Sequence, residues 1–254
     1  MGENSIDRSK VTNNFANHKG TIIKKENRHM TKQDSIEELR RLLKVRLEEW
    51  RLRETTPQAR PKPIVTITRE PGSGGESIAE TLSAELGMHL YDWELVEHIA
   101  KDEEVSPQLV SKLEETMPTE LEEYMDELLG ECNLSSEGYL GSLKRVLLAI
   151  AIPGNAVIVG RGSNFFLPPD RKIGLCFVAP LELRVKTTMK ELGLSEKDAR
   201  RHISRLEAKH RKRVKKYFQT DIRDSAHYHL VINTALVKPE TIIQIVKTMI
   251  SAQI

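Results

Sequence analysis

The feature that most constrains the fold is a glycine-rich loop between a strand-like and a helix-like segment. Residues 64–68 read Ile-Val-Thr-Ile-Thr, a β-branched apolar run typical of a strand buried on both faces of a parallel sheet. Pro-Gly-Ser-Gly-Gly follows at residues 71–75, and residues 77–86 form a helical pattern that stops at Gly87. Glycines allow consecutive N–H groups to turn toward one point, where the helix N-terminus adds partial positive charge. The pattern therefore predicts a phosphate-binding turn.

This loop departs from the usual phosphate-binding pattern G-x-x-x-x-G-K-[ST]. If Gly74 takes the second glycine position, Arg69 stands at the first glycine and Gly75 stands where the phosphate-binding lysine belongs. Glu76 and Ser77 come next. The strict motif is absent, and a glycine-rich turn that binds no ligand remains the alternative interpretation.

Further strand-like segments alternate with helical patterns along the rest of the chain. Strands are expected at residues 88–91, 156–160, 173–179 and 229–232. Helices are expected at 181–192, where Gly193 ends the pattern, from Ser195 with Asp198 as its start, and from Pro239 to near the C-terminus. This alternation predicts an α/β fold with a parallel sheet.

The sequence divides into three parts. Residues 1–33 are polar without periodicity and are expected to be disordered, whereas residues 34–62 combine an amphipathic helix with a proline-rich linker. The helix at 34–54 either packs on its own domain or forms a homo-oligomer or partner contact. Residues 63–254 form the domain proper, in which residues 93–150 are mainly helical.

Composition and charge exclude several classes of protein. The 39 Lys and Arg residues nearly balance the 37 Asp and Glu residues, which argues against a general nucleic-acid coat protein. Positive charge is local instead, because residues 184–216 hold 13 basic and 4 acidic side chains. Two cysteines cannot build a disulfide framework, and neither a bilayer-spanning apolar run nor a secretion signal is evident. We therefore expect a cytoplasmic protein without a membrane partner, and scattered His and Cys residues predict no metal site.

Five motifs in a fixed order resemble the cytidylate kinase-like family, relatives of bacterial cytidylate kinase among the nucleoside monophosphate kinases. The resemblance covers residues 64–250. Its motifs are the sequence ITREPGSGG at residues 67–75, Tyr91-Asp92, VIVGRGSN at residues 157–164, APLELR at residues 179–184, and residues 228–234. The family resemblance implies a three-layer P-loop kinase fold with a parallel sheet, a helical acceptor-binding insertion at 93–150 and a lid at 195–218.

The resemblance also implies an activity and a set of site residues. It implies transfer of a phosphoryl group from ATP, with Mg²⁺, to a nucleoside monophosphate or a similar small phosphorylated acceptor. The donor would be held by the loop residues Arg69, Gly72, Ser73, Gly74, Gly75 and Ser77. Asp92 and Arg161 would hold the acceptor, and the basic side chains of the lid, Arg205, Lys209, Arg211 and Arg213, would meet the transferring group. Phosphoryl transfer needs such aligned positive charge more than covalent help from the protein.

Structural roles remain open for several of these residues. Asp92 is equally suited to cap a helix, Ser77 to be an ordinary first-turn residue, and the basic run to be a solvated helix face.

Two departures from cytidylate kinase leave the function open. The resemblance implies Lys at position 75 and Asp at position 162, whereas this chain has glycine at both. Arg69 or a lid arginine would have to supply the missing positive charge, or phosphoryl transfer is slow or absent. The alternative is therefore a nucleotide-binding regulatory module without catalysis. Nucleic-acid binding through the basic segments is a third, less favoured interpretation.

Overall fold

The structure is a computed structural model. It describes residues 22–23, 63–92, 154–160 and 162–252, together with residues 96, 143, 146–147 and 150–151. Arg161, the helix expected at 34–54 and most of the expected insertion at 93–150 lie outside the described residues. The predictions for these segments, and for an oligomer formed through residues 34–54, therefore stay predictions.

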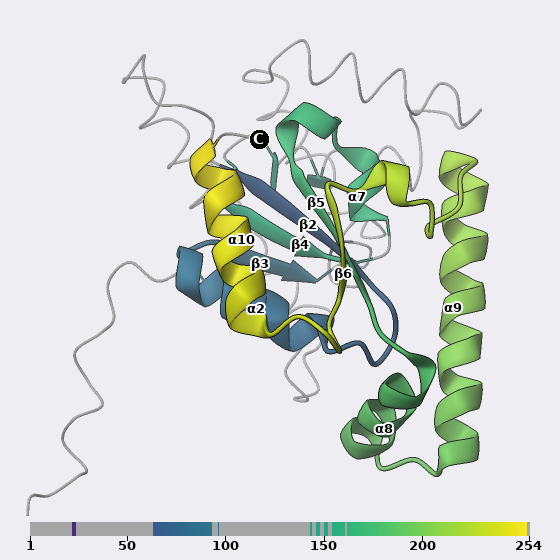
Figure 1. The fold of residues 1–254 in the computed structure, drawn as a ribbon. Coiled ribbons are helices and arrows are strands. Elements are labelled where there is room, and N and C mark those ends of the chain that lie inside the picture. Colours follow the sequence, from purple (N-terminus) through teal and green to yellow (C-terminus); the bar gives the residue numbers. More distant parts are fainter. Residues whose placement is uncertain are drawn as a thin grey trace, which may run out of the picture.

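A parallel sheet forms the centre of the molecule (Figure 1). Its five main strands lie in the order β3-β4-β2-β5-β6, and every pairing between neighbours is parallel. Their bounds are Ile64–Arg69 for β2, His89–Asp92 for β3, Ala156–Val159 for β4, Ile173–Val178 for β5 and Leu230–Asn233 for β6. The parallel α/β architecture predicted from the alternating patterns is confirmed.

A two-residue strand lies beside β3 at the edge of the sheet. This strand, β1 (Ile22–Ile23), pairs with Leu90 and Tyr91 in parallel register. It falls within residues 1–33, whose other members are outside the described part of the chain. The expectation of disorder for this segment stays a prediction.

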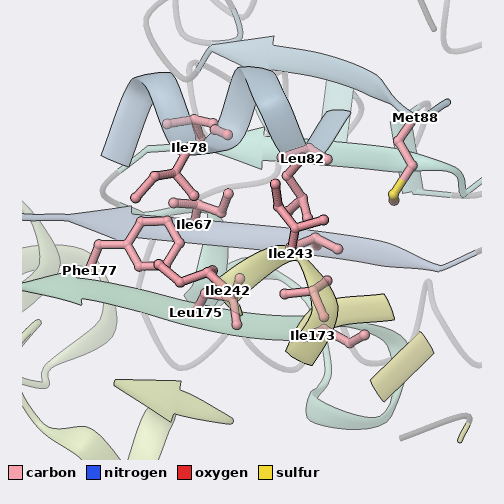
Figure 2. Close-up of a cluster of buried hydrophobic side chains, with 14 of the residues drawn as sticks. Ile67, Ile78, Leu82, Met88, Ile173, Leu175, Phe177, Ile242 and Ile243 are labelled. Carbon is pink, nitrogen blue, oxygen red and sulfur yellow. The ribbon is translucent and has the colours of Figure 1, made fainter. Parts of the chain in front are cut away.

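Two helices cover one face of the sheet and close the main core. They are α2 (Gly75–Leu86) and α10 (Pro239–Ala252), which both lie across the strands in Figure 1. Figure 2 shows apolar side chains from both helices meeting those of β2 and β5. The contributing side chains from the sheet include Ile67, Leu175 and Phe177, all fully buried. Burying a side chain of this size contributes about 1.5–3 kcal/mol, so this layer fixes where α2 begins relative to β2.

The other face of the sheet is covered by α7 (Ser163–Phe166) and the C-terminal part of α9 (Glu196–Phe218). Cys176 points to this face because side chains alternate along a strand, and it packs with Phe165, Val214 and Tyr228. The N-terminal part of α9 packs instead on α8 (Leu181–Leu192), through Ala199 and Ile203 against Val185. The long α9 thus joins α8 to the body of the domain.

The predicted strands match the observed bounds to within one residue at each end, helix α8 matches at both ends, and the start of α2 is wrong by two residues. Helix α8 spans the predicted 181–192 and ends at Gly193, and the Ser195 side chain caps α9 by accepting from the Asp198 N–H. Helix α2 begins at Gly75 rather than at residue 77 because Gly74, at φ 76°, serves as its N-cap. Asp92 is the last residue of β3. Among the described residues, none of the helices combines the length and apolarity needed to cross a membrane.

Candidate functional site

The glycine loop forms a tight turn between β2 and α2. The Ser73 N–H donates to the Glu70 carbonyl over 3.1 Å, and Gly72 and Gly74 both adopt positive φ, at 77° and 76°. Such backbone angles are strained for any residue with a side chain. No side chain caps the N-terminus of α2. Since the first amides of a helix lack intrahelical acceptors, this turn presents N–H groups that an anion can accept from.

One side of this turn is closely packed, and the other is open. A Cβ on Gly72 would collide with the Arg184 carbonyl oxygen and lie 2.8 Å from Thr188 Oγ1. A Cβ on Gly74 would meet no atom within 4 Å. The loop therefore packs against α8 at Gly72 and faces open space at Gly74, so a ligand could approach it from the Gly74 side.

Ser73 carries a polar group that nothing in the described part of the chain satisfies. The residue is 4% exposed, and its Oγ has no hydrogen-bond partner there. Its carbonyl accepts from Thr234 Oγ1 over 2.7 Å, which anchors the loop to the end of β6. A buried hydroxyl without a partner costs about 1–3 kcal/mol, and a bound anion at this turn could relieve that cost.

The position of the missing lysine is filled by other side chains. A Cβ on Gly75 would lie 2.9 Å from Arg69 Cβ and 3.0 Å from Phe177 Cδ2. Arg69 itself forms an ion pair with Glu76 through Nη2. The Glu76 side chain is 64% exposed, so it points to solvent and does not plug the turn. Burial raises the pKa of Glu191 on α8, and the Glu76 carboxylate raises it further, which places two acids near this side of the loop.

Arg184 connects the loop to the predicted lid, and sequence reasoning did not select it as a site residue. Its side chain is 9% exposed, and its Nε donates to the Ala179 carbonyl over 2.9 Å and lies 3.3 Å from Glu70 Oε2. Its Nη1 lies 2.5 Å from Glu207 Oε1 on α9. Glu70 Oε2 also accepts from the Ala179 N–H over 3.0 Å. One buried guanidinium therefore joins the end of β2, the start of α8 and the middle of α9.

Asp92, another predicted site residue, lies at the carboxyl edge of the same sheet. Asp92 ends β3 opposite Val159, and β4 separates β3 from β2. Strands are about 4.8 Å apart, so Asp92 lies roughly 10 Å from β2. Strands β2 and β4 are neighbours, but the chain continues from β2 to β3 toward one edge of the sheet and from β4 to β5 toward the other edge. Open α/β sheets bind ligands at such switch points, where the direction of the connections reverses. Arg161 follows Gly160 at this edge in the sequence but lies outside the described residues.

The basic residues predicted for the lid lie on one continuous helix. Arg205, Lys209 and Arg211 are exposed on α9, and Arg213 is half-buried. The residue of α9 that reaches the loop side is Glu207, through Arg184. Arg223, which the sequence did not single out, pairs with Asp221, and the carboxylates of Glu207 and Glu70 also contribute to raising its pKa. The role of the lid arginines in catalysis stays a prediction.

The described residues can accommodate Mg²⁺ with a nucleotide only if the nucleotide's phosphates supply most of the metal's oxygen ligands. Within the described ranges, no group of three or more His, Cys, Asp or Glu side chains is placed to hold a metal ion. Ser77 is exposed in the first turn of α2, where a hydroxyl could reach an ion bound to phosphates. Mg²⁺ is commonly held in this way, by substrate phosphates, waters and one or two protein oxygens.

Comparison with known families decides which group of proteins this chain is related to. Residues 64–236 match the sequence model of the Cytidylate kinase-like family. The chain belongs to this family. Its sequence is 27% identical to the cytidylate kinase of Ignicoccus hospitalis over 74% of this chain and 98% of the relative. The cytidylate kinase of Pyrococcus horikoshii is 28% identical over 74% of this chain and 88% of its own length.

A solved structure supports the fold of this family member. An uncharacterized protein from Eubacterium ventriosum aligns with a TM-score of 0.58 and 20% sequence identity, covering 75% of this chain and 99% of that protein. At this identity the likeness concerns the fold alone. The predicted family is therefore confirmed, while the activity and the roles of individual residues are addressed below.

Proposed function

We propose that this member of the Cytidylate kinase-like family transfers a phosphoryl group from ATP to a nucleoside monophosphate. The observation that carries the proposal is the open N-terminus of α2, where the glycine turn leaves amides uncapped and the Ser73 hydroxyl buried without a partner. Family membership and relatives named cytidylate kinase support CMP as the first acceptor to test.

Arg69 supplies the positive charge that a lysine at position 75 would otherwise provide. Its guanidinium lies beside the first turn of α2, held by Glu76. Ion pairs with one solvent-exposed partner contribute only about 0–1 kcal/mol, so a triphosphate can replace the Glu76 carboxylate at low cost. A guanidinium binds two phosphate oxygens at once and stays charged at any working pH.

The remaining roles follow from position at the carboxyl edge of the sheet. The amides of residues 74–77 hold the donor phosphates, Ser77 offers an oxygen to Mg²⁺, and Asp92 and Arg161 bind the acceptor. Mg²⁺ would neutralise phosphate charge during transfer. Arg205, Lys209, Arg211 and Arg213 on α9 supply positive charge to the transferring group. Transfer then depends on alignment, charge neutralisation and exclusion of water.

A coupled nucleotide kinase assay with ATP and Mg²⁺ tests the proposal. The acceptors are CMP, dCMP, UMP, AMP, GMP and dTMP, and we expect turnover with at least one of them. Arg161→Met should lower kcat/KM at least 100-fold, whereas Arg171→Met, on the exposed turn before β5, should leave it unchanged. Folded protein that turns over none of the six acceptors would contradict the proposal.

A second candidate function is a nucleotide-binding module without catalysis. The close packing of Arg69 and Phe177 around Gly75 favours it, because this arrangement excludes the lysine that other phosphate-binding loops use. Calorimetry separates the two candidates. ATP binding without turnover supports the module, and a measurable rate that falls in Arg161→Met excludes it.

A further inference from the structure

A pocket lies on the face of the sheet opposite α2 and α10, near the N-terminal ends of β5 and β6. Its volume is about 440 Å³, within the usual range for small-molecule sites. It lies between α7, the C-terminal end of α9 and the short turn η3 (Ser225–His227), in the upper part of Figure 1, whereas α8, which contacts the glycine loop, lies at the bottom. The pocket is therefore separate from the proposed nucleotide site.

A buried ammonium group forms part of the pocket wall. Lys172 is 7% exposed, and its Nζ donates to the Asn164 carbonyl and, over 2.7 Å, to the Leu167 carbonyl. All three residues line the pocket. An ammonium has three N–H donors, so one remains for a ligand. Within the described part of the chain no carboxylate pairs with Lys172, and no Asp or Glu belongs to the lining.

The buried Lys172 ammonium lacks a carboxylate partner in the described part of the chain, which costs folding free energy, and an anionic ligand can remove this cost. Burial lowers the pKa of Lys172 from 10.5 to about 8, because surroundings with little water disfavour the charged form. A buried charge is normally paired with an opposite charge, and none of the described residues supplies one to Lys172. An anion entering the pocket would supply it.

His229 adds a second donor beside Lys172. Its Nδ1 accepts from the Gly174 N–H over 3.0 Å, so the proton of the neutral ring resides on Nε2. Burial and the nearby Lys172 charge lower its pKa, which keeps the ring neutral at pH 7. Among the described residues, the other ionisable groups near this region are His227, paired with Thr220 and Asp224, the Arg171–Asp170 pair on the turn before Lys172, and Tyr228. Tyr228 donates its hydroxyl to the Ile222 carbonyl, and burial raises its pKa.

Aromatic rings also line the pocket. Phe165 stacks on Phe218 with ring centroids 5.2 Å apart, and His227 and Tyr228 approach Phe165 edge-on. A flat ligand can pack on these rings while an acidic group reaches Lys172. Among the described residues of the lining, Lys172 carries the single formal positive charge. A monoanion neutralises this charge, whereas a dianion would leave one negative charge buried.

We propose that this pocket binds a small aromatic carboxylate, with its carboxylate on Lys172 and His229 and its ring against Phe165. The proposal does not depend on kinase activity, because the pocket shares no lining residue with the glycine loop.

Calorimetric titration of the full chain with benzoate tests this site. Benzoate should bind at least tenfold more tightly than benzamide, which has the same shape without the charge, and more tightly than inorganic phosphate. Its affinity should fall as pH rises from 7.0 to 9.5, since Lys172 loses its proton. Equal binding of benzoate and benzamide, tighter binding of phosphate, or no binding of benzoate would overturn the proposal.

Two variants locate the binding to this pocket. Lys172→Met should weaken benzoate binding at least tenfold, and Lys186→Met, an exposed lysine on α8, should not. If Lys172→Met does not fold, because two carbonyls lose their donor, Ala226→Trp provides the test by filling the pocket without touching Lys172. Unchanged benzoate affinity in Ala226→Trp would place the binding elsewhere and overturn the proposal.

Discussion

At the scale of single residues, Gly75 shows why the loop cannot simply regain the usual lysine. A Cβ at this position would meet Arg69 Cβ, which is held by the backbone at the end of β2, and the Phe177 ring, which is buried in the core. We expect Gly75→Lys to destabilise the fold by about 1–3 kcal/mol without improving ATP binding, since overpacking a tight site has this cost. Urea denaturation and calorimetry with ATP measure the two effects.

The matched control for this substitution is Gly75→Ala. It introduces the same Cβ without the ammonium, so its loss of stability should resemble that of Gly75→Lys. A stable Gly75→Lys variant that binds ATP more tightly than the natural sequence would show that the packing around this position is not the reason for the glycine.

The Glu76 carboxylate places a negative charge beside the proposed phosphate site. It shares the first turn of α2 with the expected phosphates and holds Arg69. Removing one charge about 6 Å from an anion changes binding by roughly 0.7 kcal/mol per charge in water, about threefold. Glu76→Gln should therefore lower the Kd for ATP at least threefold at low salt. Asp170→Asn, which removes an exposed charge far from the loop, should not change it, and equal effects of both variants would point to net charge alone.

At the scale of elements, the Arg184 network joins α8 and α9 to the end of β2 next to the glycine loop. Arg184→Met leaves Glu70 and Glu207 without their partner, and both carboxylates are about one-third exposed. We expect a loss of about 2 kcal/mol, below the 3–5 kcal/mol typical of a fully buried pair. Glu207→Gln should cost less, because Arg184 keeps Glu70. Denaturation of both single variants and the double variant measures the coupling, and additive effects would contradict a shared network.

The end of α9 offers a separate test of element stability. Gln219 closes this helix with φ at 52°, a left-handed conformation that glycine adopts without strain. Gln219→Gly should raise the free energy of unfolding by about 0.5–1 kcal/mol despite the greater freedom of the unfolded chain. Thermal denaturation measures the change, and Tyr217→Gly, within the helix, should instead lower the melting temperature.

Residue patterns along the chain predicted the helices and strands of this fold, but they could not predict contacts between residues that are distant in the sequence. The run Ile64-Val65-Thr66-Ile67 and the stop at Gly193 each depend on neighbouring residues, and both were predicted correctly. The start of α2 was misplaced because the sequence does not reveal that Gly74 takes positive φ. The contact between Arg184 and Glu70 depends on where α8 is placed on the sheet, and no periodicity contains that information.

The sequence predicted correctly that a glycine-rich turn joins β2 to α2, and anion binding at this turn stays a prediction. The strand and glycine pattern indicated an anion site at the sheet edge, and the structure places an open turn there. The pairing of Arg69 with Glu76 and the closure of the Gly75 position were not predictable, because both depend on the orientation of side chains across the turn. Whether Arg161 and the lid arginines meet the substrate stays a prediction.

At the scale of the whole molecule, three buried groups with shifted pKa values, all in the described part of the chain, contribute to how stability changes in alkaline solution. Burial lowers the pKa of Lys172 to about 8, so between that pH and 10.5 the unfolded chain binds more protons and stability rises with pH. Burial, with a contribution from Glu70, raises the pKa of Cys176 from 9.0 to about 12, so stability falls with pH above 9. Burial also raises the pKa of Tyr228, which adds to this loss above pH 10.

These opposing effects predict a plateau in the pH dependence of stability. From pH 7.5 to 9 the Lys172 effect exceeds that of Cys176, and the free energy of unfolding should rise by about 1 kcal/mol. Between pH 9 and about 10 the two effects nearly cancel, and stability should fall beyond that range. Urea denaturation from pH 7.5 upward measures this curve above the range in which His229 titrates, since burial lowers the pKa of that residue.

Two substitutions separate the contributions because they change the curve in opposite directions. Lys172→Met should abolish the rise, leaving a stability that only falls above pH 8, whereas Cys176→Ala should let the rise continue past pH 9. A natural protein whose stability is flat from pH 7.5 to 9 would show that Lys172 remains fully protonated in the folded state. In that case Lys172 would already have an anionic partner, and the pocket would have no uncompensated charge with which to attract a carboxylate.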